Sequence, residues 1–522
     1  MKTERYFYRA LNILLIIVIA VSTAHVFTAY FIDRSLWIDE AMLMKSVVTR
    51  DFAGILAGMF DDNQSAPPGY MILVKAISYV FGNSTMSLRL ASMILFFASI
   101  WFIYLIARDG MKFRIPLLPV AVIMSLWTVA YYATETKPYI GDVFFSLLSI
   151  WIYFRYKNGK TSFMTCALIM AVSIWFAFGA LFTMGGLCAY HFVSCSHNLY
   201  LKKETAQEYW KQILPLIIVA VSVGLYYLLW ALPASKNVPP ANIDNYWDLI
   251  KFPLIPTSKA DLITLIEMFR HLTDIEIQGT VSVCILFLGL ALYIIFFRRT
   301  WFFYAMLWSF AMLLVVSWLG MYPMQLRLVL SQYVILWLMA LCGIDRCISR
   351  IAKNKYTIAL IAVVFIVPLG FAVRHAFDFS DKAFHLERHD VRECLEYVSE
   401  HRGPGSKVYI SPSSRPEAQF YLNYPDTTSM YETVINETGD YIWGGMFRQA
   451  QSIYPYSYTI TMQPERIDYN VRAIMKYDDV YIIDSHAPRV HIELIKALRE
   501  AGCKVEQVAD FHRTYVWHCT KQ

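Results

Sequence analysis

Charged residues are scarce in this sequence. They make up 16% of the 522 residues, whereas hydrophobic residues make up 57%, and soluble domains carry about a quarter charged residues. This composition excludes an ordinary soluble protein and predicts a protein of the lipid bilayer. The formal net charge of +6 does not indicate nucleic-acid binding, because the basic residues lie in short stretches between apolar runs. We therefore expect no nucleic acid among the partners.

Several familiar motifs are also missing. None of the nine cysteines lies in a Cys-x-x-Cys pair, so a zinc site is not expected. The last 150 or so residues contain neither a Gly-x-Gly-x-x-Gly nor a P-loop motif, so nucleotide binding has no support there. The first apolar run lacks a small-residue cleavage site and is expected to remain as an anchor. Cys503 and Cys519 flank a predicted hairpin, where a disulfide and two free thiols both remain open.

Long apolar runs fill residues 1–374. Runs of roughly membrane-spanning length cover 11–30, 88–106, 115–132, 139–154, 162–177, 182–194, 213–231, 280–297, 301–319, 328–343 and 357–373. With the N-terminus inside, Lys and Arg form about one residue in three of the inner segments and about one in twelve of the outer ones, as the positive-inside rule requires. We predict an α-helical polytopic membrane protein with about 11 transmembrane helices, N-terminus in and C-terminus out.

Residues 375–522 follow a different pattern. Helical periodicity at 391–401 and 491–502 alternates with strand-like stretches at 406–412, 478–484, 504–509 and 514–519. Strands that alternate with helices indicate an α/β domain. The sequence therefore predicts a transmembrane module, 1–374, followed by a soluble extracytoplasmic α/β domain, 375–522.

Two adjacent acids, Asp39 and Glu40, lie in the first outer loop, 31–87, within the stretch SLWIDEA (35–41). An amphipathic, interfacial helix is expected at about 40–60, and a second helix after Pro67-Pro68. One acid at such a place would simply cap a helix or face solvent. The adjacent pair favours a chemical function.

Other charged residues are expected at the same membrane face. Glu135 and Lys137 lie in the short outer connector 133–138, where they form either a surface ion pair or part of a site close to the bilayer. Arg327, at the outer end of the tenth run, either contacts lipid headgroups or binds phosphate through its planar guanidinium. Carboxylates could deprotonate a hydroxyl or hold a metal ion, and the cations could hold the phosphate of a lipid-linked substrate.

The segments LWIDEA (36–41), APPGYMILVKAISYVFGNSTMSLRLASMILF (66–96) and TETKPY (134–139) resemble the GT-C glycosyltransferases of the protein mannosyltransferase-like superfamily. They are most similar to the bacterial branch that includes the aminoarabinose–lipid A transferases and the rhizobial lipopolysaccharide core transferases. The resemblance is good over 1–140, extends through 373 and is weak beyond. The matching positions are Asp39, Glu40, Pro67, Pro68, Tyr70, Arg89, Leu90, Ala91, Glu135, Pro138 and Tyr139. The sequence departs from the family pattern at Ala66, Thr134 and Lys137.

The resemblance implies an inverting glycosyltransferase of the cell envelope. It would move a monosaccharide from a polyprenyl-phosphate donor to a hydroxyl of an envelope glycolipid, glycan or protein, at the outer face of a bacterial inner membrane. Asp39 would be the catalytic base. Glu40 and Glu135 would orient acceptor and sugar or, with Asp39, bind a divalent cation such as Mg²⁺ or Mn²⁺ if one is used.

The other matching residues are expected to bind substrate. Lys137 and Arg327 would stabilise the charge that develops on the polyprenyl phosphate. Pro67, Tyr70, Arg89 and Tyr139 complete the predicted substrate-binding residues. The loop 232–279 would close over the donor, and the C-terminal domain would hold the acceptor.

Three alternatives stay open at this stage. A transporter or flippase of lipid-linked sugars would place ionisable groups near the bilayer midplane, whereas the centres of these runs are almost free of charge. A diphosphate-lipid-dependent glycan ligase or polymerase would carry more outer cations. An inactive homologue that acts as a scaffold is favoured mildly by Ala66 and Lys137.

Overall fold

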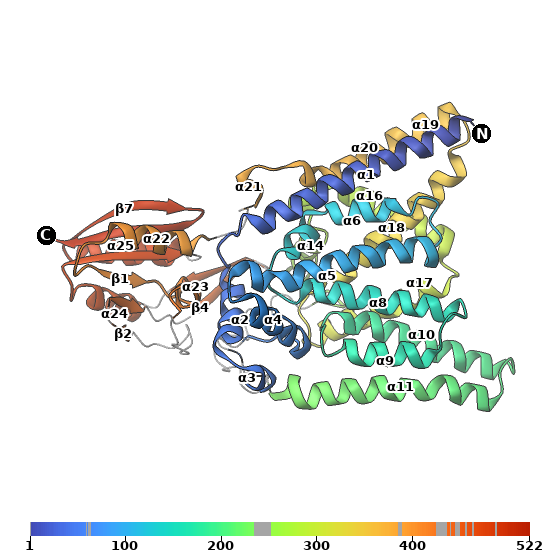
Figure 1. Cartoon of the computed structure of the whole chain (residues 1–522), viewed down its shortest axis with the longest axis horizontal. Coiled ribbons are helices and arrows are strands. Elements are labelled where there is room, and N and C mark those ends of the chain that lie inside the picture. The colour runs from blue at the N-terminus through green and yellow to red at the C-terminus, as the bar shows by residue number, and fades with distance from the viewer. Residues whose placement is uncertain are drawn as a thin grey trace.

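The structure is a computed structural model of the chain. It describes residues 2–58, 60, 64–233, 252–384, 389–423, 436–438, 440–443, 449–454, 457–461, 464–485 and 488–522. A bundle of long helices forms one part, and a smaller unit of strands and helices forms the other (Figure 1). The N-terminus lies at the end of the bundle away from the smaller unit, and the C-terminus lies within that unit.

The bundle follows the apolar runs of the sequence. Its main helices are α1 (Lys2–Phe31), α5 (Thr85–Leu105), α6 (Leu117–Ser125), α7 (Trp127–Ala133), α8 (Tyr139–Lys157), α9 (Phe163–Ser173), α10 (Ala180–Tyr200), α11 (Ala206–Tyr226), α16 (Thr280–Phe297), α17 (Trp301–Trp318), α18 (Leu330–Ile351), α19 (Lys355–Ile361) and α20 (Val367–Val373). In the described part of the chain, six stretches are long and apolar enough to cross a membrane. The chain is thus a multi-pass membrane protein; the figure of about 11 crossings and the N-in orientation stay predictions.

The fifth and sixth runs form two separate helices, α9 and α10, as predicted. Between them, the Gly179 backbone N–H donates a hydrogen bond of 2.8 Å to Oδ1 of Asp142 in α8. A Cβ atom at position 179 would lie 3.0 Å from the Leu328 carbonyl oxygen and 3.1 Å from the Asp142 carboxylate. The turn therefore packs closely on α8 and on the segment that leads to α18.

Glycines also set the spacing of two long helices. A Cβ atom at Gly343 of α18 would lie 2.4 Å from the Gly289 carbonyl oxygen of α16. Small residues at such crossings let two helix backbones approach each other. This close packing fixes α18, which begins three residues after Arg327.

Three shorter helices cover the end of the bundle that faces the C-terminal unit: α2 (Ile38–Thr49), α3 (Phe52–Leu56) and α4 (Pro68–Phe81). The single helix predicted at 40–60 is in fact two, because Asp51 caps α3 through a 2.7 Å bond from the Gly54 N–H. The second predicted helix is confirmed as α4; proline at its first position has a backbone φ that suits a helix start.

The position of α2 differs from the prediction of an interfacial helix. Nine of its twelve residues are buried, including Lys45 and Ser46 on the polar face. The physical reason is that α4 and the C-terminal helix α23 (Arg415–Tyr421) pack against it.

The C-terminal unit is an α/β sandwich, as predicted. Its six-stranded sheet has the order β2-β3-β1-β6-β8-β7, in which β1 pairs in parallel with β3 and β6. The strands are β1 (Lys407–Ile410), β2 (Asn436–Thr438), β3 (Tyr441–Trp443), β6 (Asp479–Ser485), β7 (Cys503–Phe511) and β8 (Thr514–Lys521), with a separate hairpin of β4 (Gln449–Tyr454) and β5 (Ser457–Thr461). Helix α22 (Val391–His401) packs on one face, and α24 (Pro464–Ile474) and α25 (Pro488–Glu500) pack on the other.

The sequence patterns located the predicted helices and strands of this unit correctly, but missed β2, β3, β4, β5, α23 and α24. The predicted final hairpin is β7 and β8, and Cys503 and Cys519 lie on these two strands as free, buried thiols. Of the two alternatives, the structure therefore has free thiols. Burial raises the pKa of the Cys519 thiol to about 12, which keeps it protonated and unreactive.

Candidate active site

The two adjacent acids of the first loop lie in the first turn of α2. Neighbouring residues of a helix point in directions about 100° apart, so the two carboxylates cannot share one environment. Glu40 is fully buried, at 0% exposure, whereas the Asp39 side chain keeps 25% of its surface. The two acids therefore have different surroundings.

Glu40 forms a buried ion pair with Arg89 of α5, which is 1% exposed. Its Oε1 accepts hydrogen bonds from Arg89 Nε at 3.2 Å and from the Thr136 backbone N–H at 2.8 Å. Its Oε2 accepts from Arg89 Nη2 at 2.9 Å and from the Trp37 backbone N–H at 3.1 Å. Both oxygens are thus used in holding α2, α5 and the 134–138 loop together.

Arg89 extends this network to the segment before α2. Its Nη1 donates to the Arg34 carbonyl oxygen at 2.7 Å, and its Nη2 donates to the Ser35 carbonyl oxygen at 3.2 Å. The guanidinium has five N–H donors in a fixed fork, and here it donates hydrogen bonds to a carboxylate and to two backbone carbonyls. Arg89 therefore shapes the site without lining it.

Asp39 meets Arg327, a residue 288 positions further along the chain. Arg327 Nη1 lies 2.9 Å from Asp39 Oδ2, and the two side chains are 20% and 25% exposed. Arg327 Nε also donates to Gln325 Oε1 at 3.1 Å, and its guanidinium lies over the Trp37 ring, 5.6 Å from the ring centroid. The predicted base and the predicted phosphate ligand are thus in direct contact.

Lys137 lies beside this pair and is nearly buried, at 5% exposure. Its Nζ donates a 2.8 Å hydrogen bond to Gln64 Oε1. Burial lowers the pKa of Lys137, and the positive charge of Arg327 lowers it further, while Asp39 and Glu135 act in the opposite direction. Gln64 was not predicted as a site residue, because a single polar residue ahead of a proline pair gives no signal in the sequence.

Glu135 and Tyr139 belong to the same cluster of side chains. Both are buried, and both lie within electrostatic range of Lys137 or of the Asp39–Arg327 pair. The Tyr139 ring also packs edge-on against Tyr132, with 5.2 Å between the centroids. The structure therefore brings together the charged residues that the sequence singled out on three separate segments.

Pro67 and Tyr70 contribute to the site only indirectly. Pro67 caps the start of α4, and the buried Tyr70 hydroxyl lies 3.0 Å from Ser92 Oγ, which donates to the Glu135 carbonyl oxygen at 2.6 Å. Tyr70 thus supports the 134–138 loop through Ser92, and neither Pro67 nor Tyr70 touches the Asp39–Arg327 pair in the contacts described.

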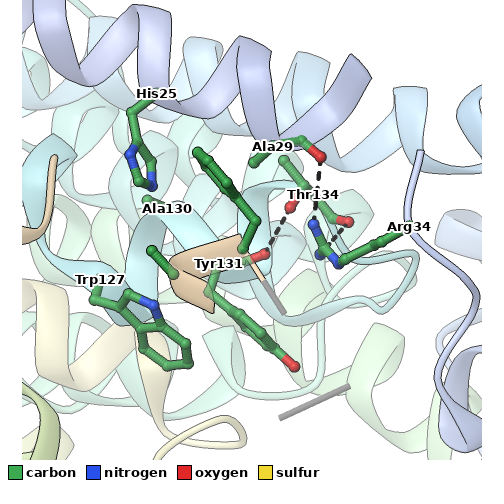
Figure 2. A pocket seen from close by; sticks show the side chains of 9 residues that line it. His25, Ala29, Arg34, Trp127, Ala130, Tyr131 and Thr134 are labelled. Carbon is green, nitrogen blue, oxygen red and sulfur yellow. Dashed lines mark hydrogen bonds between the residues drawn. The ribbon is translucent and has the colours of Figure 1, made fainter. Parts of the chain in front are cut away.

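A small cavity lies on the far side of this loop, between α1 and α7. Figure 2 shows Arg34, at the start of the first loop, directed toward Ala29 and Thr134, with His25, Trp127 and Tyr131 nearby. Arg34 donates to the Thr134 carbonyl oxygen at 2.8 Å and to the Ala29 carbonyl oxygen at 3.4 Å. The cation thereby ties the residue before Glu135 to the end of α1.

The proposed cation ligands Asp39, Glu40 and Glu135 do not form a matched donor set. Both Glu40 oxygens are taken by Arg89 and backbone N–H groups, and Asp39 faces a guanidinium. In the described residues, no group of three His, Cys, Asp or Glu side chains could hold a metal ion. This arrangement of donors does not fit a divalent cation.

We expect Glu40→Gln to destabilise the protein strongly. The substitution leaves the Arg89 charge buried without its carboxylate, which costs about 3–5 kcal/mol, so the melting temperature in detergent should fall by several degrees. The matched control is Asp39→Asn next to it, which removes one partner of a partly exposed pair worth about 0–1 kcal/mol. Equal losses from the two variants would contradict the assigned difference in burial.

Comparisons with known proteins were made for sequence and for structure. No protein-family model and no curated protein matches the chain. Among solved structures, ArnT from Cupriavidus metallidurans bound to undecaprenyl phosphate aligns with a TM-score of 0.52 at 12% identity, over 97% of this chain and 98% of that one. The apo state of the same protein gives 0.49 at 12% identity, over 98% of each chain.

The Archaeoglobus fulgidus oligosaccharyltransferase, solved with Zn and sulfate, gives a TM-score of 0.45 at 12% identity, over 89% of this chain and 67% of that one. At such identities a likeness in structure shows the fold, and the alignment with undecaprenyl-phosphate-bound ArnT extends over both the bundle and the C-terminal unit. The chain is therefore a polytopic membrane protein with a GT-C fold, as its resemblance in sequence predicted.

Proposed function

We propose that this chain is a membrane glycosyltransferase that moves a monosaccharide from a polyprenyl-phosphate donor to a hydroxyl group, with inversion. The observation that carries the proposal is the meeting of Asp39, Lys137 and Arg327, a carboxylate and two cations from three distant segments. A base and a phosphate-binding pair are the groups that such a transfer needs. The undecaprenyl phosphate in the ArnT structure supports a lipid phosphate as the ligand of the two cations.

In the proposed reaction, Asp39 accepts the proton of the acceptor hydroxyl as its oxygen attacks the anomeric carbon. The bond between the anomeric carbon and the phosphate oxygen breaks, and its electron pair leaves with the polyprenyl phosphate. Arg327 and Lys137 stabilise that negative charge. A single displacement of this kind inverts the configuration at the anomeric carbon.

The contact between Asp39 and Arg327 fits these two tasks. A guanidinium carries five N–H donors, so Arg327 can bind a phosphate with the donors that Asp39 does not use. The pair is partly exposed, and ion pairs of that kind contribute little to stability. An incoming phosphate can therefore draw the guanidinium toward itself and leave Asp39 available to the acceptor.

The remaining assignments follow from position. Glu135 and Tyr139 lie within electrostatic range of Lys137 or of the Asp39–Arg327 pair and would contact the sugar or acceptor, while Glu40 positions α2 through Arg89. The acceptor would be an envelope glycolipid, glycan or protein at the extracytoplasmic face of the inner membrane. Residues 234–251, the centre of the loop predicted to close over the donor, lie outside the described residues.

We expect Asp39→Asn to lower transfer by at least about 100-fold, because loss of a general base typically costs 10²–10⁴. Purified wild type and variant would be incubated with a panel of polyprenyl-phosphate sugars and an envelope lipid extract, and released polyprenyl phosphate measured by mass spectrometry. Asp478→Asn, at an exposed acid of the C-terminal unit, is the control. An Asp39→Asn enzyme with normal turnover would exclude Asp39 as the base.

Arg327→Gln should raise the KM for the donor more than that for the acceptor, and should lower kcat as well, because the guanidinium is assigned to the phosphate in both ground and transition states. Arg108→Gln, at an exposed arginine in the segment that follows α5, serves as control. If donor kinetics stay unchanged, Arg327 is only a lipid-facing anchor.

In the panel of donors, release from diphosphate-linked donors alone would favour a ligase or polymerase.

The pH profile should report Lys137. Because burial lowers its pKa, this lysine loses its charge at a lower pH than an ordinary lysine, whose pKa is about 10.4. We expect kcat/KM for the donor to fall as the pH rises through this lowered pKa. Lys137→Arg stays charged at every working pH and should move the alkaline limb upward; an identical limb in the variant would assign it to another group.

A further inference from the structure

The C-terminal unit makes a set of specific contacts to the segment that carries Asp39. In Figure 1, α23 lies at the junction with the bundle, close to α2, and the two helices pack together. Phe420 and Tyr421 of α23 join the hydrophobic core of the bundle. The unit is therefore in direct contact with the proposed active site.

Tyr421 binds the backbone directly before the start of α2. Its hydroxyl oxygen accepts a 2.6 Å hydrogen bond from the Leu36 backbone N–H and a weaker one of 3.4 Å from Ser35 Oγ. Leu36 is fully buried and immediately precedes Trp37, the N-cap of α2. Burial raises the pKa of Tyr421 to about 12, so the phenol stays neutral at physiological pH.

Arg392 of α22 binds the same segment three residues before Leu36, at Asp33. Its Nη2 donates to the Asp33 carbonyl oxygen at 2.6 Å, and its Nη1 donates to Asp33 Oδ2 at 3.2 Å. The guanidinium also lies over the Tyr421 ring, 5.9 Å from the centroid. The two residues thus act together on four residues of chain, 33–36.

This short segment is held from both sides. Its carbonyl groups at Arg34 and Ser35 bind Arg89 of the bundle, whereas the Asp33 carbonyl and the Leu36 N–H bind the C-terminal unit. Asp33 has a positive φ of 49°, a conformation that is uncommon outside glycine and persists where the surroundings over-determine it.

The polar face of α2 meets the C-terminal unit as well. Lys45, six residues after Asp39, donates a buried 2.6 Å hydrogen bond to Gln419 Oε1 of α23. Two points on α2 and the turn before it are thereby fixed by the C-terminal unit. A rigid support of this kind matters at an active site, because a misplacement of about 1 Å can cost on the order of 100-fold in rate.

We infer that Tyr421 and Arg392 are positioning residues of the transfer reaction: they hold the turn 33–36 so that Asp39 faces the acceptor and Arg327. The inference rests on the proposed function, and it gives the C-terminal unit a direct part in catalysis. Neither residue touches the proposed reaction centre in the described structure, so both act through the backbone that leads into α2.

The test compares Tyr421→Phe with Tyr397→Phe. Tyr397 belongs to the same unit, and its hydroxyl donates only to the Val508 carbonyl oxygen, at 3.3 Å. At saturating donor we expect Tyr421→Phe to release polyprenyl phosphate at least about ten-fold more slowly, with unchanged affinity for undecaprenyl phosphate. Its melting temperature should fall by no more than a few degrees, because the buried Leu36 N–H loses its acceptor. Tyr397→Phe should match the wild type in turnover and affinity. If Tyr421→Phe also turns over at the wild-type rate, or if its affinity for undecaprenyl phosphate falls as much as its turnover, the positioning role is wrong.

Amide hydrogen exchange supplies a readout that does not need activity. Peptides that cover 33–41 should exchange faster in Tyr421→Phe than in Tyr397→Phe, because the Leu36 N–H loses its acceptor. Equal exchange in the two variants would overturn the inference even if no donor is turned over by the wild type, an outcome that would refute the proposed function separately.

A second pair of variants covers the case in which Tyr421→Phe does not fold. Arg392→Lys keeps a cation near Asp33, whereas Arg392→Gln does not. We expect the lysine variant to recover most of the turnover that the glutamine variant loses, at equal affinity for undecaprenyl phosphate. Equal turnover in both would contradict a role for this cation in positioning.

Discussion

The buried ion pair between Glu40 and Arg89 is the interaction on which the rest of the site depends. Neither charge can remain alone in a low-dielectric interior without a large cost, so the pair fixes α2 against α5. Each partner also binds backbone groups of a further segment: Glu40 binds the Thr136 N–H, and Arg89 binds the Arg34 and Ser35 carbonyls. One contact thereby fixes both loops from which the proposed base and one phosphate ligand come.

The second ion pair, between Asp39 and Arg327, has the opposite character. Its side chains keep 25% and 20% of their surface, so water screens the attraction and a competing anion can displace one partner at little cost. The difference in burial thus separates a contact that is costly to break from one that can rearrange at little cost. Two acids adjacent in sequence supply both, because consecutive helix positions face different surroundings.

Much of the fold could be predicted from the sequence, because apolar runs and alternating patterns are local signals. Arg327 was found for a similar reason, since a lone cation at an outer helix end is conspicuous. The division of labour between Asp39 and Glu40 could not be predicted, because it depends on Arg89, whose contacts with Glu40 exist only once α2 and α5 pack. Gln64, Arg392 and Tyr421 could not be predicted for the same reason: each is a single polar residue whose partner lies in a segment far away in the sequence.

The burial of α2 connects these observations. A helix with apolar residues on one side and Lys45, Thr49 and Arg50 on another is typical of a membrane surface. Here, however, Lys45 is buried against α23, where it donates a hydrogen bond to Gln419. A helix that only lay on the bilayer surface would have no fixed position relative to the bundle, and Asp39 would move with it. Packed between the bundle and the C-terminal unit, the same helix can present the Asp39 carboxylate to the Arg327 guanidinium, from a segment 288 residues away.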